Sequence, residues 1–97
     1  MAQFDITASQ CRAARALIEW SREDLAEASR VGLRTLVDFE RGARSPRAVT
    51  LDALRWALEI AGVIFVDQNG DGPGVRLRKA HAINEGPRQN LGAQSDK

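Results

Sequence analysis

The residues with the most evident chemistry in this sequence are arginines gathered in one short segment. Residues 30–47 hold five arginines against two acids, although the formal net charge of the whole chain is only +1. A guanidinium donates paired hydrogen bonds to phosphate, to carboxylate and to the edge of guanine. Twelve of the 14 cations in the chain are arginine. The segment therefore suits an anionic partner, and the alternative explanation for the preference for arginine is the coding bias of a GC-rich genome.

Helix start and stop signals predict how this segment is folded. Ser21 and Asp24 have the spacing of an N-terminal capping box, which predicts a short helix over about 22–29. A second short helix is predicted over 33–41, with Gly42 as its stop. Two short helices joined by a tight turn form the layout of a helix-turn-helix, in which the second helix enters the major groove of DNA.

The flanking residues predict a mainly α fold, a bundle of four or five helices followed by a short pair of β-strands. Thr7 and Gln10 open a first helix with capping-box spacing, and a fourth helix runs from about 48 to 62. The consecutive apolar run at 63–66 predicts a strand buried on both faces, and the alternating run at 75–79 an edge strand. The chain then divides into a helix-turn-helix domain (7–62), a strand extension that serves dimerisation (63–79) and a polar tail (80–97).

At this point the sequence resembles a known family. The stretch from Trp20 to Gly42, WSREDLAEASRVGLRTLVDFERG, is similar to the XRE (Cro/C1-type, lambda-repressor-like) helix-turn-helix family, and the resemblance covers roughly residues 9–61. It implies a bundle of four or five helices that binds DNA sequence-specifically. The strongest matches are Leu25-Ala26, Val31, Leu36 and Phe39-Glu40-Arg41-Gly42, and Pro46 with Thr50-Leu51 matches the start of the following helix.

The resemblance implies DNA-contacting roles for particular residues. Arg34 is the expected base reader, because arginine pairs bidentately with guanine. Leu33 and Val37 are expected to touch thymine methyl groups. Asp38 is expected to accept a hydrogen bond from cytosine, and Thr35 to contact backbone or base. Phosphate contacts are expected from Arg22, Arg41, Arg44 and Arg47.

Other positions bear on how the recognition helix is held. The family pairs an arginine of its first helix with a glutamate, and Arg15 and Glu40 fit that pattern as a structural ion pair. Arg30 stands where the family usually has glycine in a left-handed turn, at a cost on the order of 1 kcal/mol. Gly32 stands where the family has a Ser or Thr cap, which is a few tenths of a kcal/mol stronger. Asp38 in addition repels phosphate. Because of these departures, the resemblance does not predict the DNA affinity or the operator sequence.

The fourth helix carries two apolar stripes on roughly opposite sides. A single small domain buries only one stripe per helix, so the second is expected to form a homodimer interface. The alternative is that the strand at 63–66 folds back and covers it within one chain. The second stripe consists of Val49, Ala53, Trp56 and Ile60, and the strand residues expected to join the interface are Val63, Ile64, Phe65 and Val66.

Taken together, these features favour a homodimeric transcriptional repressor that inserts helix 33–41 into the major groove of palindromic double-stranded DNA. One alternative is an antitoxin whose C-terminal strands or tail bind a toxin protein, with DNA binding as autoregulation. Another is a degenerate domain that keeps the fold for protein contacts alone.

Other classes of protein find little support in the sequence. No nucleophile, base and orienting group form a recognisable motif, so neither an enzyme nor a cofactor is expected. No metal is expected either, because 67–72 matches only half of an EF-hand loop and His81 stands alone. Cys11 is the sole cysteine, which fits a reducing cytoplasm. The N-terminus lacks a signal-peptide pattern, and no apolar stretch is long enough to predict a membrane span.

Overall fold

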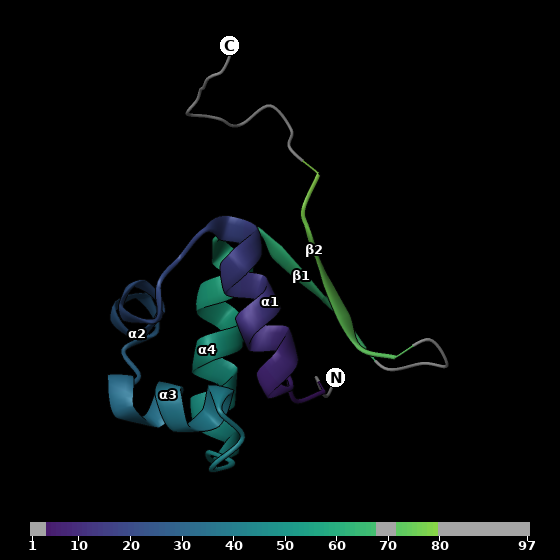
Figure 1. Cartoon of the computed structure of the whole chain (residues 1–97). Coiled ribbons are helices and arrows are strands. Elements are labelled where there is room, and N and C mark those ends of the chain that lie inside the picture. The colour runs from purple at the N-terminus through teal and green to yellow at the C-terminus, as the bar shows by residue number, and fades with distance from the viewer. Residues whose placement is uncertain (1–3, 68–71, 80–97) are drawn as a thin grey trace.

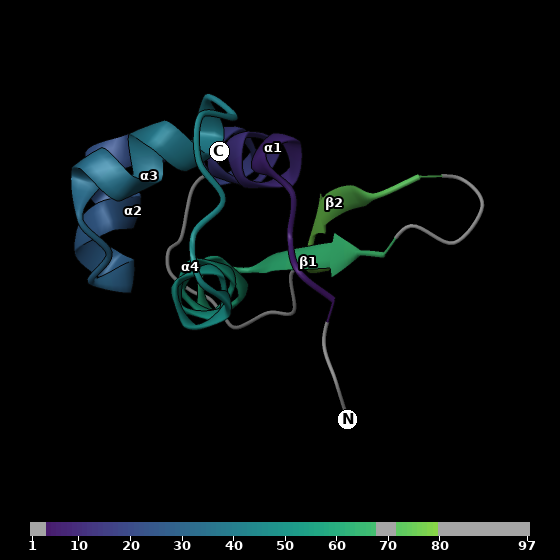
Figure 2. The ribbon, with the colours of Figure 1, turned by 90° about the horizontal axis from the view of Figure 1, so that it is seen from below.

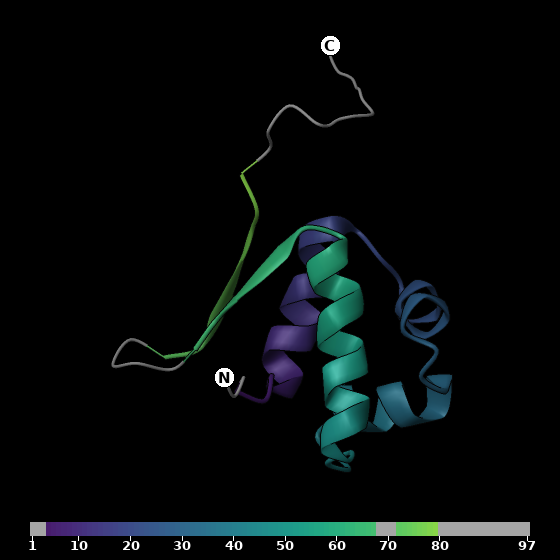
Figure 3. The ribbon, with the colours of Figure 1, turned by 180° about the vertical axis from the view of Figure 1, so that it is seen from behind.

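The computed structural model describes residues 4–67 and 72–79. Helices α1 (Ala8–Ile18), α2 (Arg22–Ser29), α3 (Leu33–Glu40) and α4 (Ala48–Ile60) are followed by strands β1 (Val63–Val66) and β2 (Gly74–Leu77). α1 and α4 lie side by side, with α2 and α3 to one side of them and the strand pair to the other (Figures 1 and 3). The predicted mainly α bundle with a terminal strand pair is confirmed. The predicted tail, 80–97, lies outside the described residues.

Capping boxes set the starts of the first two helices. The Thr7 hydroxyl accepts a hydrogen bond from the Gln10 amide at 3.0 Å, and the Gln10 side chain accepts one from the Thr7 amide at 2.9 Å. Ser21 and Asp24 make the same reciprocal pair at 3.0 Å each. α3 has no such device, because Gly32 precedes it without a side-chain cap. The two predicted capping boxes are therefore confirmed, and α3 begins after Gly32 without one.

Left-handed residues turn the chain between the helices. Arg30 has φ 64°, as its place in the turn predicted, so α2 ends there in a conformation that strains a non-glycine residue. Glu19 at the end of α1 is also left-handed, with φ 58°, which the sequence did not predict. Gly42, with φ 76°, follows α3 and tolerates this conformation without strain. These turns set α2 and α3 across each other beside α1 (Figure 1).

The core lies among the four helices and one face of the strand pair. Cys11 and Ala14 of α1 are buried in it, whereas Leu17 on the same helix is 38% exposed. At 100° per residue Leu17 lies at the margin of the face that Cys11 and Ala14 share. The buried apolar residues are Ile6, Cys11, Ala14, Leu25, Leu36, Phe39, Leu51, Leu54, Ala57, Leu58, Val63 and Phe65.

The strands form an antiparallel pair whose burial alternates. Val63 pairs with Leu77 and Val66 with Gly74. Val63 and Phe65 are buried, whereas Ile64 and Val66 are half-buried. The predicted burial of the run on both faces is therefore wrong, because only one face of this sheet packs on the helices. The expected place of Val63 and Phe65 in a dimer interface is also wrong, since both belong to the core of their own chain.

The strand pair leaves the second stripe of α4 uncovered. Figure 2 shows the strands beside α1 and the C-terminal end of α4, on the side away from α2 and α3. Val49, Trp56 and Ile60 are 70%, 67% and 66% exposed. The alternative in which the strand covers this stripe within one chain is therefore wrong. The apolar face remains open in the described structure.

A buried glutamine anchors the strand pair to α1. Gln10 Nε2 donates to the carbonyl oxygen of Val66 at 3.0 Å and to that of Gly74 at 2.9 Å. These two residues face each other in the register of the sheet. One side chain thus ties the ends of both strands to the first turn of α1, while its Oε1 still serves the capping box with Thr7.

A buried arginine ties α4 to the N-terminal segment and to β1. The Arg55 guanidinium carbon lies 4.4 Å from the centroid of the Phe4 ring and 5.4 Å from that of Phe65. Arg55 also donates to the Phe4 carbonyl at 2.8 Å and to the Glu59 carboxylate at 2.8 Å. Its charge is therefore compensated at the edge of the core, and the cation–π contacts stabilise the packing of the two rings.

Candidate nucleic-acid interface

α3 presents two faces of different chemistry. Leu36, Phe39 and Glu40 are buried against the other helices. On the opposite side the Arg34 side chain is 88% exposed and Leu33 is 40% exposed. The structure thus leaves Arg34 and Leu33 accessible on a short helix that lies at the margin of the molecule (Figure 2). Of the predicted set, Arg41 is also exposed, and Thr35, Val37 and Asp38 are half-buried.

Arg34 and Asp38 form a pair that the sequence prediction treated as two separate contacts. Arg34 Nε lies 3.4 Å from Asp38 Oδ2, one turn further along the helix. The Asp38 side chain is only 18% exposed, so the carboxylate is the fixed partner and the guanidinium the free one. Such a surface pair contributes less than about 0.5 kcal/mol. Arg34 can therefore leave Asp38 at little cost when a better acceptor is present.

Three arginines line the connection from α3 to α4. Arg41, Arg44 and Arg47 are all exposed, and none of them forms a salt bridge within the described residues. The connection lies at the N-terminal end of α4, next to α3 (Figures 1 and 3). Exposed, unpaired guanidinium groups beside an exposed helix are suited to the phosphates on either side of a groove.

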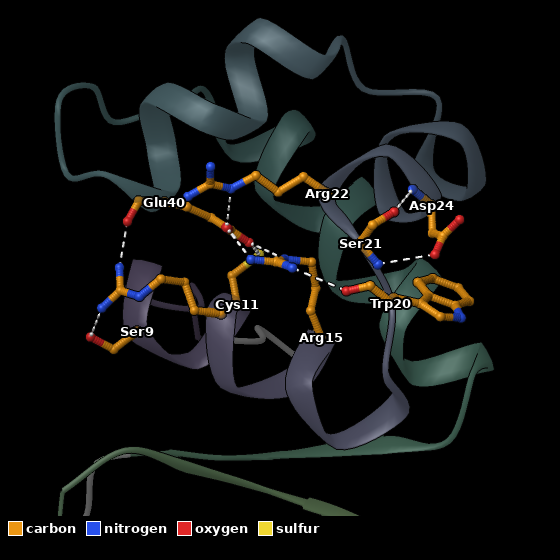
Figure 4. A network of polar contacts seen from close by, with 9 residues as sticks. Ser9, Cys11, Arg15, Trp20, Ser21, Arg22, Asp24 and Glu40 are labelled. Atoms are coloured by element: carbon orange, nitrogen blue, oxygen red, sulfur yellow. Dashed lines mark hydrogen bonds and ion pairs between the residues drawn. The ribbon is translucent and has the colours of Figure 1, made fainter.

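A buried carboxylate holds α3 against α1 (Figure 4). Glu40 is fully buried in its side chain, and Arg15 binds it with both ends of the guanidinium fork. Arg15 Nε donates to Oε2 and Nη2 donates to Oε1, each at 2.7 Å. The remaining Nη1 of Arg15 donates to the Trp20 carbonyl at 3.0 Å. The two residues predicted to pair are thus in direct bidentate contact.

Further side chains complete this cluster. Arg22 Nε donates to Glu40 Oε1 at 2.9 Å, so the arginine expected to reach only outward to phosphate is drawn partly inward. Cys11 Sγ donates to Glu40 Oε2 at 3.2 Å. Arg12 donates to the backbone carbonyl of Glu40 and, at 3.1 Å, to the Ser9 hydroxyl. Sequence reasoning missed these three partners. The arginines at positions 12 and 22 were a signal for two of them, and Cys11 had no such signal.

The cluster shifts the titration of its members. Burial opposes ionisation of Glu40, but the hydrogen bonds from Arg15 and Arg22 outweigh it and hold the pKa of this carboxyl below its ordinary value. The hydrogen bond to Glu40 raises the pKa of Arg15. Burial, and then the charge of Glu40, raises the pKa of the Cys11 thiol. Glu40 therefore stays ionised, and Cys11 stays a protonated donor, at neutral pH.

This arrangement sets the angle of the exposed helix. α1 supplies Arg15, α2 supplies Arg22, and both converge on the last residue of α3. The glutamate is neutralised internally, so its charge does not offset the arginines of the connection that follows α3. Within the described residues, no three His, Cys, Asp or Glu side chains come together as they would at a metal site. α3 is thus fixed through its buried end, and exposed arginines lie on it and in the connection that follows it.

Comparison with known proteins identifies this arrangement. Residues 12–60, just over half of the chain, match the model of a family described as helix-turn-helix. No curated protein matches the chain. No helix within the described part of the chain is long and apolar enough to cross a membrane. The matched residues include α2, α3 and the arginine–glutamate cluster, and the chain therefore belongs to the Cro/C1-type (XRE) helix-turn-helix family of DNA-binding regulators.

Proposed function

We propose that the protein is a homodimeric transcriptional repressor that places α3 in the major groove of a palindromic operator. The observation that carries this proposal is the exposed face of α3, on which the Arg34 side chain is 88% exposed and paired only with Asp38, with Arg41, Arg44 and Arg47 exposed beside it. A helix of this kind, mounted through its buried end, can enter the groove while the neighbouring cations hold the phosphates.

The proposed contacts are of two kinds: some read the bases, and others bind phosphates and so position the protein on the DNA. Arg34 pairs with guanine, and Asp38 accepts from a neighbouring cytosine once Arg34 has moved to its base. Leu33 and Val37 meet thymine methyl groups, and Thr35 contacts base or backbone. Phosphates are bound by Arg41, Arg44 and Arg47, and by the terminal nitrogens of Arg22, whose Nε is held by Glu40.

The proposed dimer interface is the uncovered stripe of α4. Val49, Trp56 and Ile60 are each about two-thirds exposed, and Ala53 lies among them half-buried. Exposed apolar residues that recur along one helix mark an interaction surface. Two copies would address half-sites about one helical turn of DNA apart. The half-buried Ile64 and Val66 of β1 are the strand residues still available to extend this contact.

Single arginine replacements test the groove assignment. Arg34→Ala should lower affinity for an operator selected from random DNA by about 1–3 kcal/mol and relax specificity at one position, as expected for a bidentate base contact. Arg44→Ala should instead weaken specific and non-specific binding alike and reduce the salt slope by about one. Fluorescence anisotropy against salt measures both effects.

Arg76→Ala is the matched control for these replacements. Arg76 is an exposed arginine on β2, and Figure 2 shows β2 on the opposite side of α1 and α4 from α3. Its loss should leave operator binding unchanged. If Arg34→Ala behaved like Arg76→Ala, α3 would not be the reading helix.

A second candidate function uses the same apolar face. An antitoxin would bind a toxin protein through its C-terminal strands or tail, extend that contact over the α4 stripe, and use α3 only to control its own expression. The exposure of Val49, Trp56 and Ile60 suits either partner. Co-expression with the product of the neighbouring gene, followed by co-purification, distinguishes the two. A stable complex lost in Trp56→Asp would favour the antitoxin, and a homodimer that excludes the neighbouring product would favour the repressor.

A further inference from the structure

We infer that the face shared by α2 and α4 binds a basic, amphipathic helix of another protein, in which an apolar stripe is flanked by lysines or arginines. The inference goes beyond the proposed repressor, because it gives this face a partner that is neither DNA nor a second copy of the chain. None of the described residues that line the face belongs to α3 or to the connection after it. Only the competition with a second copy rests on the proposed homodimer.

Three open hollows adjoin one another along this face, where α2 lies beside α4 (Figure 3). The first, of about 430 Å³, lies at α2 and has Trp20 in its wall. The second, of about 170 Å³, lies between α2 and α4 and has both Trp20 and Trp56 in its walls. The third, of about 390 Å³, runs along α4 from Trp56 to Val49. The two tryptophans therefore link the hollows into one continuous apolar surface.

The dimensions of this surface suit a helix better than a small molecule. Val49 and Ile60, which are 70% and 66% exposed, lie about 16 Å apart along α4, a distance that about three turns of a second helix would cover. The central hollow is smaller than the roughly 300–1,000 Å³ that is usual for a ligand pocket. A helix laid along the face would place an apolar side chain of each successive turn in a hollow.

Acidic side chains lie on both sides of the apolar stripe. On one side α2 contributes Asp24 and Glu27, which line the first hollow. On the other side α4 contributes Asp52 and Glu59, which line the third. At 100° per residue, Asp52 and Glu59 lie about 40° and 60° to one side of Trp56, whereas the residues that face α2 lie on its other side. A partner helix therefore meets negative charge along both of its edges.

Most of this negative charge is available to a partner. Asp24, Glu27 and Asp52 are exposed, and none of them forms a salt bridge within residues 4–67 and 72–79. Glu59 is 27% exposed and is already paired with Arg55. Among the described residues that line the three hollows, none is an exposed lysine or arginine.

The sign of these charges decides which partner the face favours. A second copy of the chain would bring the same acids against one another, and DNA phosphates would be repelled by them. Lysines or arginines beside an apolar stripe would instead meet opposite charges on both sides while the stripe covers the tryptophans. The complement of this face is therefore a cationic helix with an apolar centre.

Selection from a peptide library tests this charge preference without assuming a partner sequence. Helical peptides are displayed with one stripe randomised among apolar residues and the flanking positions among lysine, arginine, glutamine, glutamate and aspartate. The full chain is the bait at 50 mM NaCl, and peptides that also bind Trp56→Ala are discarded. We expect the retained peptides to carry about three times as many cationic as acidic flanking residues, because opposite charges favour association. Retained flanks without a cationic bias, or no peptide that prefers wild type to Trp56→Ala, would overturn the inference.

A retained peptide then measures the contribution of the acids. Its dissociation constant should rise about fivefold in Glu27→Gln combined with Asp52→Asn, and should also rise with added NaCl. Glu23→Gln is the matched control, because Glu23 is an exposed acid of α2 that lines none of the three hollows. Its loss should leave the affinity unchanged. An equal loss of affinity in the control, or none in the double variant, would contradict binding at this face.

Competition with a second copy separates this inference from the proposed function. If the homodimer forms through the α4 stripe, the retained peptide should convert dimers into monomers in sedimentation. Dimers that persist with the peptide bound would support the docking face and overturn the α4 homodimer. Operator DNA takes no part in the peptide measurements, so the two proposals can fail independently.

Discussion

At the scale of single residues, Glu40 joins the stability of the fold to its DNA-binding geometry. Its carboxylate is fully buried and receives hydrogen bonds from Arg15, Arg22 and Cys11. A buried charge is tolerated only when it is paired and its lone pairs are occupied, and here both conditions hold. Because the partners come from α1 and α2, one side chain fixes α3 relative to both.

Replacement of Glu40 should therefore be costly in a pH-dependent way. Glu40→Gln leaves two guanidinium groups without their counter-charge, and we expect the free energy of unfolding at pH 7 to fall by about 3 kcal/mol. The folded pKa of Glu40 lies below its ordinary value, so the stability it contributes is present above that ordinary value, 4.5, and is lost as the pH falls through the folded pKa. Urea unfolding from pH 7 to pH 3 measures the difference between wild type and variant.

We expect the difference in unfolding free energy between wild type and Glu40→Gln to become smaller as the pH falls. Asp38→Asn is the matched control, because Asp38 pairs at 3.4 Å with Arg34, whose side chain is 88% exposed. This control should lose less than about 1 kcal/mol at pH 7. The loss of unfolding free energy in Glu40→Gln could instead be as small as in the control, or stay constant below pH 4.5. Either result would contradict a buried, ionised Glu40 that is paired with Arg15 and Arg22.

Only part of this cluster could be predicted from the sequence. The pairing of Arg15 with Glu40 followed from the family resemblance, because both positions belong to a recognisable pattern. The inward turn of Arg22 did not, since an arginine at the start of a helix can face solvent or protein with equal ease. Its direction is decided by the position of Glu40, eighteen residues away. Contacts of this range depend on packing that local spacing does not encode.

At the scale of elements, local signals predicted where the helices begin but not how the strands dock. Each capping box, at Thr7 and at Ser21, depends on residues only three positions apart, and both form as expected. The run at 63–66 shows the limit, because a string of apolar residues does not reveal which face the core will cover. Gln10 is recognisable as a capping residue, yet its bonds to the strands span 56 and 64 residues.

Removal of the Gln10 side chain should release the strand pair. Gln10→Ala leaves the carbonyls of Val66 and Gly74 without this donor and also breaks the capping box. We expect a loss of about 2–4 kcal/mol in stability, because two strand carbonyls and the Thr7 amide each lose a hydrogen-bond partner, while the Thr7 hydroxyl still accepts from the amide of residue 10. Amide hydrogen exchange should show lower protection in β1 and β2.

Thr7→Ala separates the two contributions of Gln10. It removes the hydroxyl cap of α1 but leaves the bonds from Gln10 to the strands in place. This control should lose about 1 kcal/mol and keep the protection of the strand amides. Equal strand protection in Gln10→Ala and Thr7→Ala would show that the strands are held by their apolar face alone.

At the scale of the whole molecule, the net charge is near zero, but two surfaces carry charges of opposite sign. Exposed cations gather at one end: Arg34, whose only ion pair is the surface contact with Asp38, and Arg41, Arg44 and Arg47, which form no salt bridge within the described residues. Along the face of α2 and α4, the charged residues that line the hollows are all acidic: Asp24, Glu27, Asp52 and Glu59. The DNA contact is thus attractive in charge, whereas the proposed self-contact brings like charges together around an apolar centre.

These opposite signs predict opposite responses to salt. Added salt weakens DNA binding, because each phosphate contact releases condensed counterions. The same salt screens the acids around α4, so we expect the dissociation constant of the dimer to fall several-fold between 50 and 500 mM NaCl. Sedimentation equilibrium measures the dimer, and anisotropy with labelled operator measures the complex. Glu27→Gln combined with Asp52→Asn removes two of the acids and should flatten the dimer's salt response while leaving the DNA response unchanged. A dimer that weakened with salt would be held by ion pairs and not by the apolar stripe of α4.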